Sequence, residues 1–152
     1  MLKFKNLTEL KSHLGEEIGV TKSYSVNQEM IDKFAEATGD HQWIHTNPEM
    51  AKMYSPFKTT VAHGFLNLSF SPKLMAELFS VKSAKMGLNY GSNKVRFMSP
   101  VPVNANLKMS AKLIDFEAIE PNGAKIILAC TYFIDGQEKP ACYAELISVI
   151  YE

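Results

Sequence analysis

The sequence predicts a single α+β domain in which a long, largely apolar helix lies against an antiparallel β-sheet. Helix start and stop signals are concentrated in the first half of the chain, and a long apolar run follows at 65–79. From residue 88 onward the chain instead shows strand-like segments separated by turn residues. Helices followed by a run of strands are typical of α+β domains. Because 152 residues fit one domain with one core, we assign 1–152 to a single domain.

The composition argues against several classes of partner. Sixteen basic and sixteen acidic side chains balance, and Arg96 is the only arginine, so the charge pattern predicts neither a nucleic-acid surface nor a membrane surface. Residues 1–5 lack the features of a signal peptide, so we expect a cytoplasmic protein. Cys130 and Cys142 fall in apolar segments without metal-ligand spacing, and we expect them to be buried, reduced thiols.

The first forty residues carry signals for two helices and one short strand. We expect a helix over 9–14 and a strand over 19–24. A longer helix follows and ends at Gly39, and both Ser25 and Asn27 are candidates for its N-cap. The expected core-facing residues of this helix share helical spacing: Met30, Ile31, Phe34 and Ala37.

Two further helices are expected before the sheet. Asn47 and Pro48 are the residue types of an N-cap and a first helical position, which predicts a short helix over 48–53. The central helix begins at Gly64, and its apolar positions are not confined to one stripe, so we expect it to be buried nearly all round. Pro72 lacks a backbone donor and should kink this helix. Its expected core residues are Phe65, Leu66, Phe70 and Leu74.

The second half of the chain predicts an antiparallel meander. The strand-like segments are 94–98, 106–116, 125–134 and 141–150. Apolar and polar residues alternate from Leu107 to Leu113, which is the pattern of a half-buried strand. Pro121-Asn122-Gly123 and Asp135-Gly136 have turn-forming residues, so we expect hairpins at both places. A curved sheet around the central helix accounts for both the helical first half and the strand-rich second half of the sequence.

Two polar segments between the expected elements contain candidate functional residues. Asp40 and His45 lie five residues apart beside Gly39, and His63 directly precedes the central helix. From the residues alone, Asp40 is most simply a turn residue, His45 a loop histidine with a local hydrogen bond, and His63 a residue that caps or flanks the helix. His41 and His45 have the spacing of a metal-binding pair on a helix, but no glutamate supports the pair, and we do not expect a metal site.

Short motifs occur in a fixed order along the chain: Phe34 to Asp40, Ile44-His45 with Ala51, Ala62 to Phe65, Asn89 to Gly91, and Val95 to Phe97 followed by Pro100 to Val103. Together they resemble the signatures of the MaoC-like dehydratases, a family that includes the R-specific enoyl-CoA hydratases. The form of the segment from Gly39 to His45 is most similar to the branch named after nodulation protein N. The resemblance covers most of the chain.

The resemblance implies a hot-dog fold, in which a curved antiparallel sheet wraps a long central helix, and a homodimer with the substrate channel near its interface. It also implies a lyase that interconverts trans-2-enoyl thioesters and R-3-hydroxyacyl thioesters. The catalytic aspartate and histidine of the family correspond to Asp40 and His45, and its backbone oxyanion donor corresponds to the N–H of Gly64. No metal or separate cofactor is implied, because CoA or an acyl carrier enters as part of the substrate.

Five other residues are expected to contact the substrate: Gln42, Trp43, His63, Phe65 and Arg96. Many hydratases have Asn-Pro where this chain has Gln42-Trp43. We therefore expect Gln42 to supply an amide and Trp43 to narrow the channel, or to anchor a core or an interface. Arg96 is a candidate for binding a phosphate of the carrier, and a structural salt bridge is the alternative.

Two other functions stay open on the sequence. One is hydrolysis of acyl thioesters on the same fold, and the other is a non-catalytic module that binds acyl thioesters; the fold alone does not separate them. Asp40 and His45, which lie in one loop and correspond to the catalytic residues of the hydratases that this chain resembles, favour hydration over hydrolysis. A carboxylate and a neutral imidazole can hold one water and exchange protons with it. The Gln42-Trp43 change keeps the binding module open.

Overall fold

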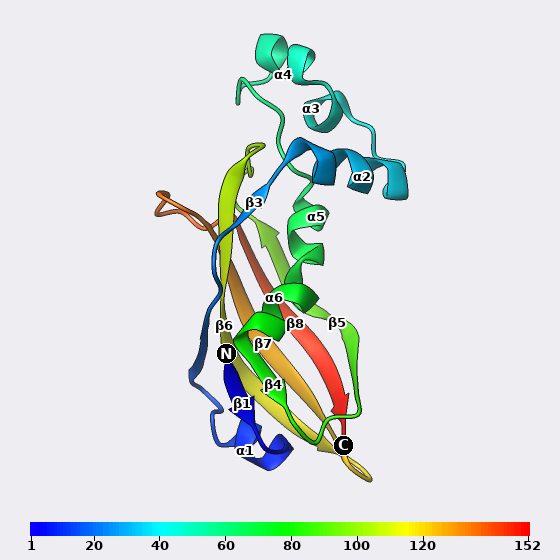
Figure 1. The fold of residues 1–152 in the computed structure, drawn as a ribbon, viewed down its shortest axis with the longest axis vertical. Coiled ribbons are helices and arrows are strands. Elements are labelled where there is room, and N and C mark those ends of the chain that lie inside the picture. Colours follow the sequence, from blue (N-terminus) through cyan, green and yellow to red (C-terminus); the bar gives the residue numbers. More distant parts are fainter.

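The computed structural model describes all 152 residues and shows a curved antiparallel sheet with two consecutive helices along one of its faces (Figure 1). The helices are α1 (Leu7–Lys11), α2 (Gln28–Thr38), α3 (Trp43–Thr46), α4 (Pro48–Tyr54), α5 (Gly64–Ser69) and α6 (Ser71–Leu78). The strands are β1 (Leu2–Phe4), β2 (Glu17–Val20), β3 (Tyr24–Val26), β4 (Phe79–Val81), β5 (Met86–Phe97), β6 (Ala105–Ile119), β7 (Gly123–Ile134) and β8 (Cys142–Tyr151). This is the α+β architecture that the sequence predicts.

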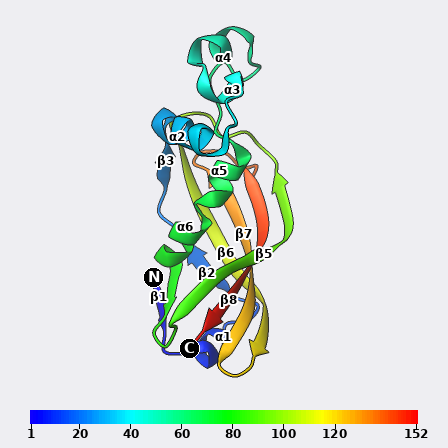
Figure 2. The same cartoon turned by 90° about the vertical axis from the view of Figure 1, so that its right-hand side faces the viewer.

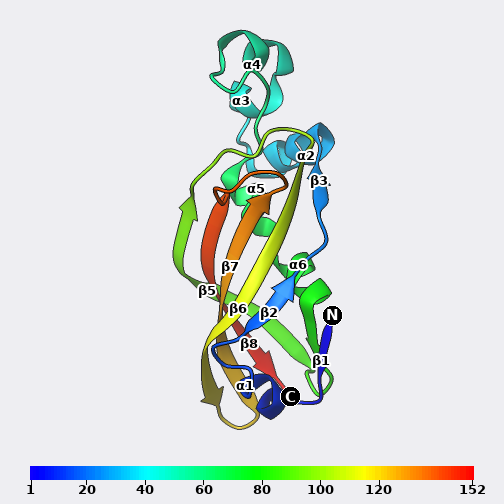
Figure 3. The same ribbon diagram turned by 90° about the vertical axis from the view of Figure 1, so that its left-hand side faces the viewer.

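The main sheet has six strands, and its order is β2-β6-β7-β8-β5, with β3 also paired to β6. All of its pairings are antiparallel. Figure 3 shows β2 and β3 following one another along β6, while β5 forms the opposite edge. A separate parallel pair joins β1 to β4. The predicted hairpins are confirmed, because β6, β7 and β8 are neighbours in sequence and in the sheet.

The core lies between the sheet and helices α5 and α6, which run along one face of it (Figure 2). Every second residue is buried along β7 and over residues 107–113 of β6, as expected for strands with one face against a core. The fully buried side chains of these two strands include Leu107, Met109, Leu113, Ile126, Leu128 and Tyr132. Helices α2, α3 and α4 lie beyond one end of the sheet (Figure 1).

The expected central helix is interrupted, which corrects the prediction of a single kinked helix. Helix α5 ends at Ser69, and α6 starts at Ser71 with Pro72 in its first turn. Proline is tolerated there because the first N–H groups of a helix have no intrahelical partner. The prediction that this helix is buried nearly all round is also wrong. Leu66 and Leu74 are buried, but Phe65 is 66% exposed. Phe65 is therefore not a core residue of this chain.

The capping residues predicted from the sequence match the observed ends of α2 and α4 but not the start of α1. Asn27 caps α2 by accepting a hydrogen bond from the Met30 N–H, and Gly39 ends it in the left-handed conformation. Asn47 caps α4, as predicted. The first helix, in contrast, begins two residues before the predicted 9–14, because Asn6 is its cap.

Two strand predictions change in their extents. The predicted strand 19–24 is two strands, β2 and β3, which pair with different parts of β6. Strand β5 begins at Met86, well before the predicted start at residue 94. Its first half is held by pairing with β8. The other three long strands match the predicted segments within a few residues.

The two cysteines are free and buried, as expected. Burial raises the pKa of Cys130 to about 12 and that of Cys142 to about 11. Both are therefore protonated thiols at neutral pH, and neither has the thiolate character that a nucleophile needs. None of the helices combines the length and apolar character needed to cross a bilayer.

A buried hydrogen bond ties α6 to the sheet and gives a first prediction. The Ser71 hydroxyl donates to the Leu68 carbonyl, so the fully buried Tyr132 hydroxyl donates to Ser71 Oγ. Ser71→Ala leaves the Tyr132 hydroxyl without its acceptor, and we expect a loss of roughly 1–3 kcal/mol in the free energy of unfolding. Tyr132→Phe removes the hydroxyl itself and should cost about 1 kcal/mol.

Urea unfolding of both variants measures these losses. Tyr143→Phe is the matched control, because the hydroxyl of Tyr143 bonds Glu145 at a part-buried position and its removal should change stability by less than about 0.5 kcal/mol. Equal stability of all four proteins would show that the Ser71–Tyr132 bond does not hold α6 to the sheet.

Candidate active site

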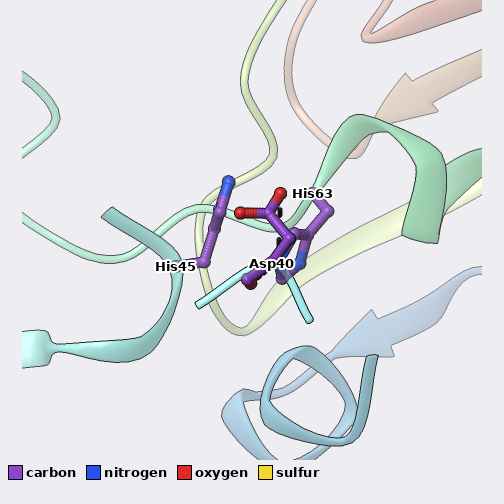
Figure 4. A group of neighbouring side chains, drawn as sticks. All are labelled: Asp40, His45 and His63. Atoms are coloured by element: carbon purple, nitrogen blue, oxygen red, sulfur yellow. Dashed lines mark hydrogen bonds and ion pairs between the residues drawn. The ribbon is translucent and has the colours of Figure 1, made fainter. Parts of the chain in front are cut away.

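Three side chains from separate segments meet beyond the end of the sheet: Asp40, His45 and His63 (Figure 4). Asp40 follows Gly39, the left-handed residue that ends α2. His45 lies in the short helix α3, and His63 is the residue before α5. One nitrogen or carboxylate oxygen of each side chain lies within 4.8 Å of those of the other two.

His45 is held as a neutral base. Its Nδ1 lies 2.6 Å from the carbonyl oxygen of Val61. A carbonyl can only accept, so Nδ1 carries the proton and Nε2 presents a lone pair. Burial is the main cause that lowers the pKa of His45 below its ordinary value, and the neighbouring His63 lowers it further. The bond to Val61 and the Asp40 carboxylate act in the opposite direction.

His63 connects the other two residues. It is buried, and its Nε2 donates to the backbone carbonyl of Asp40 over 2.9 Å. The same nitrogen lies 3.8 Å from Oδ2 of Asp40. The His63 ring stacks on that of His45, with centroids 3.9 Å apart and planes at 27°, and packs on Phe34 on another side. His63 therefore anchors the Asp40 loop to the start of α5 and supports the His45 ring.

The Asp40 carboxylate is the exposed member of the group, with 55% of its side chain accessible. Figure 4 shows it reaching toward the two imidazoles. A water held between this carboxylate and Nε2 of His45 would face solvent on one side and the buried imidazole on the other. This arrangement suits the exchange of protons with a bound water.

The geometry favours acid–base chemistry over metal binding, although the three residue types are common metal ligands. The lone pairs of an imidazole lie in the plane of its ring, and the two rings stack face to face. Their nitrogens therefore do not converge on one point between them. Nδ1 of His45 and Nε2 of His63 are also engaged by backbone carbonyls.

The amide of Gln28 supports the site, and the sequence did not identify it as a site residue. Its Nε2 donates to the carbonyl of His45 over 2.8 Å, and its Oε1 accepts from Oγ1 of Thr60 over 2.6 Å. Gln28 thus connects α3 to the segment that carries Val61. No sequence spacing signals this contact, because the partners are 17 and 32 residues away.

The other residues that were expected to contact the substrate differ in their exposure and in their packing partners. Gln42 is exposed and Trp43 is half-buried, at the start of α3. The Phe65 ring packs edge-on against Phe97, with centroids 5.3 Å apart. Arg96 forms no ion pair, and its guanidinium donates to the carbonyl of Val95. The alternative of a structural salt bridge for Arg96 is therefore wrong.

Gly64, the expected oxyanion donor, is the first residue of α5. A Cβ at this position would lie 2.9 Å from the Phe97 ring, so the packing of Phe97 alone already requires glycine here. Gly64 also lines a cavity of about 160 Å³ together with Ala62, Asn67, residues 97–101 and Ala141.

Comparison with known proteins identifies a matching family, similar sequences and a similar solved structure. The family described as "MaoC like domain" matches residues 9–126. The 3-hydroxyacyl-thioester dehydratase Z of Mycobacterium tuberculosis (strain ATCC 25618 / H37Rv) is 40% identical over 147 residues, covering 97% of each chain. Nodulation protein N of Rhizobium leguminosarum bv. viciae is 38% identical over 149 residues, covering 95% of this chain and 91% of its own. The solved structure of an unliganded R-hydratase from Pseudomonas aeruginosa superimposes with a TM-score of 0.77 at 21% identity, over 98% of this chain and 87% of that one. The last similarity confirms the hot-dog fold.

The lowered pKa of His45 predicts a pH dependence of stability. The unfolded chain protonates this histidine near its ordinary value of 6.5, whereas the folded protein does so at lower pH. Between these two values the unfolded state binds more protons, so the free energy of unfolding should rise with pH and then level off above about 6.5. Denaturant unfolding at a series of pH values measures this rise.

His45→Gln is the comparison that isolates the effect, because it keeps a polar side chain but cannot titrate. The variant should lose the part of the rise that belongs to His45, a difference of up to one proton in slope. His41→Gln removes an exposed histidine from the same loop and should leave the rise in place. Identical pH profiles for wild type and His45→Gln would contradict the depressed pKa.

Proposed function

Because this chain belongs to the MaoC-like domain family, we propose that it is a hydratase or dehydratase that interconverts trans-2-enoyl thioesters and R-3-hydroxyacyl thioesters. The observation that carries the proposal is that the Asp40 carboxylate lies within 4.8 Å of a ring nitrogen of the buried His45, whose Nε2 is left free by the bond from Nδ1 to Val61. The name of the mycobacterial relative, a 3-hydroxyacyl-thioester dehydratase, supports this class of reaction.

In the hydration direction, Asp40 and His45 hold one water between them. The water oxygen bonds to C3 of the enoyl group while its proton passes to the pair, and the pair delivers a proton to C2. The double bond thereby gains one water, and dehydration is the reverse. The tautomer of His45 suits the first step, because Nε2 must accept a proton from water.

The thioester oxygen gains negative charge as C3 is attacked, and it requires a donor that is already in place. We assign this role to the N–H of Gly64, since the first N–H groups of a helix have no intrahelical partner. The substrate carries its own CoA or acyl carrier group, so the reaction needs no metal and no separate cofactor. Arg96, whose guanidinium is exposed near this end of β5, is the candidate contact for a carrier phosphate.

A second copy of the chain is proposed to cover β5. This edge strand pairs with β8 on one side only, and nearly all of its twelve residues are exposed. Its exposed apolar side chains are Met86, Leu88, Tyr90 and Phe97. A long free edge with apolar side chains is a hazard that proteins normally cover, and self-pairing around a two-fold axis gives a closed homodimer. Phe97 also contacts Gly64, so this interface would adjoin the proposed oxyanion site.

The catalytic assignment predicts the behaviour of three variants. Asp40→Asn and His45→Gln should each lower kcat for crotonyl-CoA hydration by roughly 10²–10⁴-fold, because each removes a proton-transfer group. The loss of absorbance of the enoyl thioester measures the rate. His41→Gln is the matched control for His45→Gln, since it makes the same replacement in the same loop, and it should retain the wild-type rate.

Full hydration rates for Asp40→Asn and His45→Gln in folded protein would refute the assigned roles. Release of free thiol without hydration of the enoyl double bond would identify a thioesterase. Binding of acyl-CoA with neither reaction would identify a binding module.

The dimer proposal predicts that Leu88→Lys shifts the protein toward monomer, because it places like charges near the axis of the paired β5 strands. Sedimentation equilibrium should show a dimer dissociation constant at least tenfold higher for the variant than for the wild type. Leu14→Lys is the matched control: Leu14 is 46% exposed, Leu88 is 47% exposed, and only Leu88 lies on β5. A monomeric wild-type protein, or equal effects of the two lysines, would contradict this interface.

A further inference from the structure

We propose that Asn67 is a further catalytic residue, whose side-chain Nδ2 donates a hydrogen bond to the thioester carbonyl oxygen beside the N–H of Gly64. The inference deepens the proposed function and rests on it. It starts from one unusual feature of Asn67: the side chain is buried in α5, with 4% exposed, and its Oδ1 has no hydrogen-bond partner.

Buried polar side chains normally find partners, so an exception calls for a reason. Most other buried polar side chains of this protein follow the rule, and the exceptions besides Asn67 are the Tyr24 hydroxyl and Nδ1 of His63. The Ser71 hydroxyl bonds both Leu68 and Tyr132, and the Thr60 hydroxyl bonds Gln28. Leucine has the same branching and the same number of side-chain heavy atoms as asparagine, and it would occupy this position without an unpaired oxygen. The amide at residue 67 is therefore unfavourable for the folded chain by itself.

The position of Asn67 explains what the amide can do. Asn67 lies three residues after Gly64, and helical side chains lean toward the helix N-terminus, so its amide lies over the turn that Gly64 begins. Asn67 and Gly64 line the same cavity of about 160 Å³. Ser99 is the only other polar side chain on its wall, which is otherwise formed by Ala62, Phe97, Met98, Pro100, Val101 and Ala141.

The two ends of the amide have different surroundings. Oδ1 is fully enclosed, and Asn67 lines the cavity, so we infer that Nδ2 is the end that faces it. Nδ2 is a donor only, and a carbonyl oxygen is an acceptor only. A thioester whose oxygen meets the N–H of Gly64 would bring that oxygen to the cavity wall where Asn67 lies. Because the oxygen gains charge only during the reaction, a donor in this apolar cavity stabilises the transition state more than bound substrate.

The test compares Asn67→Leu with wild type and with Asp40→Asn in the crotonyl-CoA assay, together with thermal unfolding. We expect Asn67→Leu to lower kcat by about 100-fold with KM nearly unchanged, because an oxyanion donor acts in the transition state. Its Tm should equal or exceed that of wild type, since the unpaired Oδ1 has been removed. Asn67→Ala, which cannot clash, should show the same loss of kcat.

The combination of a lower kcat with a retained or higher Tm distinguishes a substrate contact from a structural role. Wild-type kcat in both Asn67 variants would overturn the inference, as would a loss of kcat that in both variants accompanies a loss of Tm. A wild-type protein that does not hydrate crotonyl-CoA would instead overturn the proposed function for this substrate, and this outcome is visible before either Asn67 variant is measured.

Discussion

Two backbone carbonyls determine the chemistry of this site, because each accepts a hydrogen bond from one of two stacked imidazoles. Val61 accepts from Nδ1 of His45, and Asp40 accepts from Nε2 of His63. The first bond leaves the lone pair of His45 on Nε2. The second fixes the loop that carries the carboxylate. A buried imidazole without such an acceptor could adopt either tautomer, and only one of them offers a base at Nε2.

The carbonyl of Val61 is held in position because its segment is hydrogen-bonded to the chain that enters β6. The Ala62 N–H donates to Val101 over 2.8 Å, and the Val103 N–H donates to Thr60 over 2.9 Å. Gln28 adds a bond from Thr60 to α3. His45 is thus positioned from the sheet through several bonds, whereas the carboxylate of Asp40 is half exposed and forms its one ion pair with His63. The site therefore combines a rigid, buried base with an accessible carboxylate.

The parts of this structure that the sequence predicted are those decided by neighbouring residues. Asn27, Gly39 and Asn47 mark helix ends because their own side chains or backbone angles make the local bonds. The early start of β5 depends instead on pairing with β8, some sixty residues later. The roles of Asp40 and His45 came from motif resemblance. The contacts of His63 with Asp40 and of Gln28 with His45 join segments 17 to 23 residues apart, and no periodic pattern encodes them.

The replacement of Asn-Pro by Gln42-Trp43 can be judged by what those positions do in the fold. Trp43 is the first residue of α3, the position where proline is favoured because its ring presets the backbone and its missing N–H is not needed. The helix forms without proline: the N–H of His45 donates to the Gln42 carbonyl over 2.9 Å, and the Thr46 hydroxyl adds bonds to His41 and Gln42. His45 then reaches Val61 from this turn. The chain thus lacks a preset backbone angle at residue 43 but still brings His45 to Val61, so the effect of Trp43 should fall on the space beside its half-buried ring rather than on the proposed proton transfer.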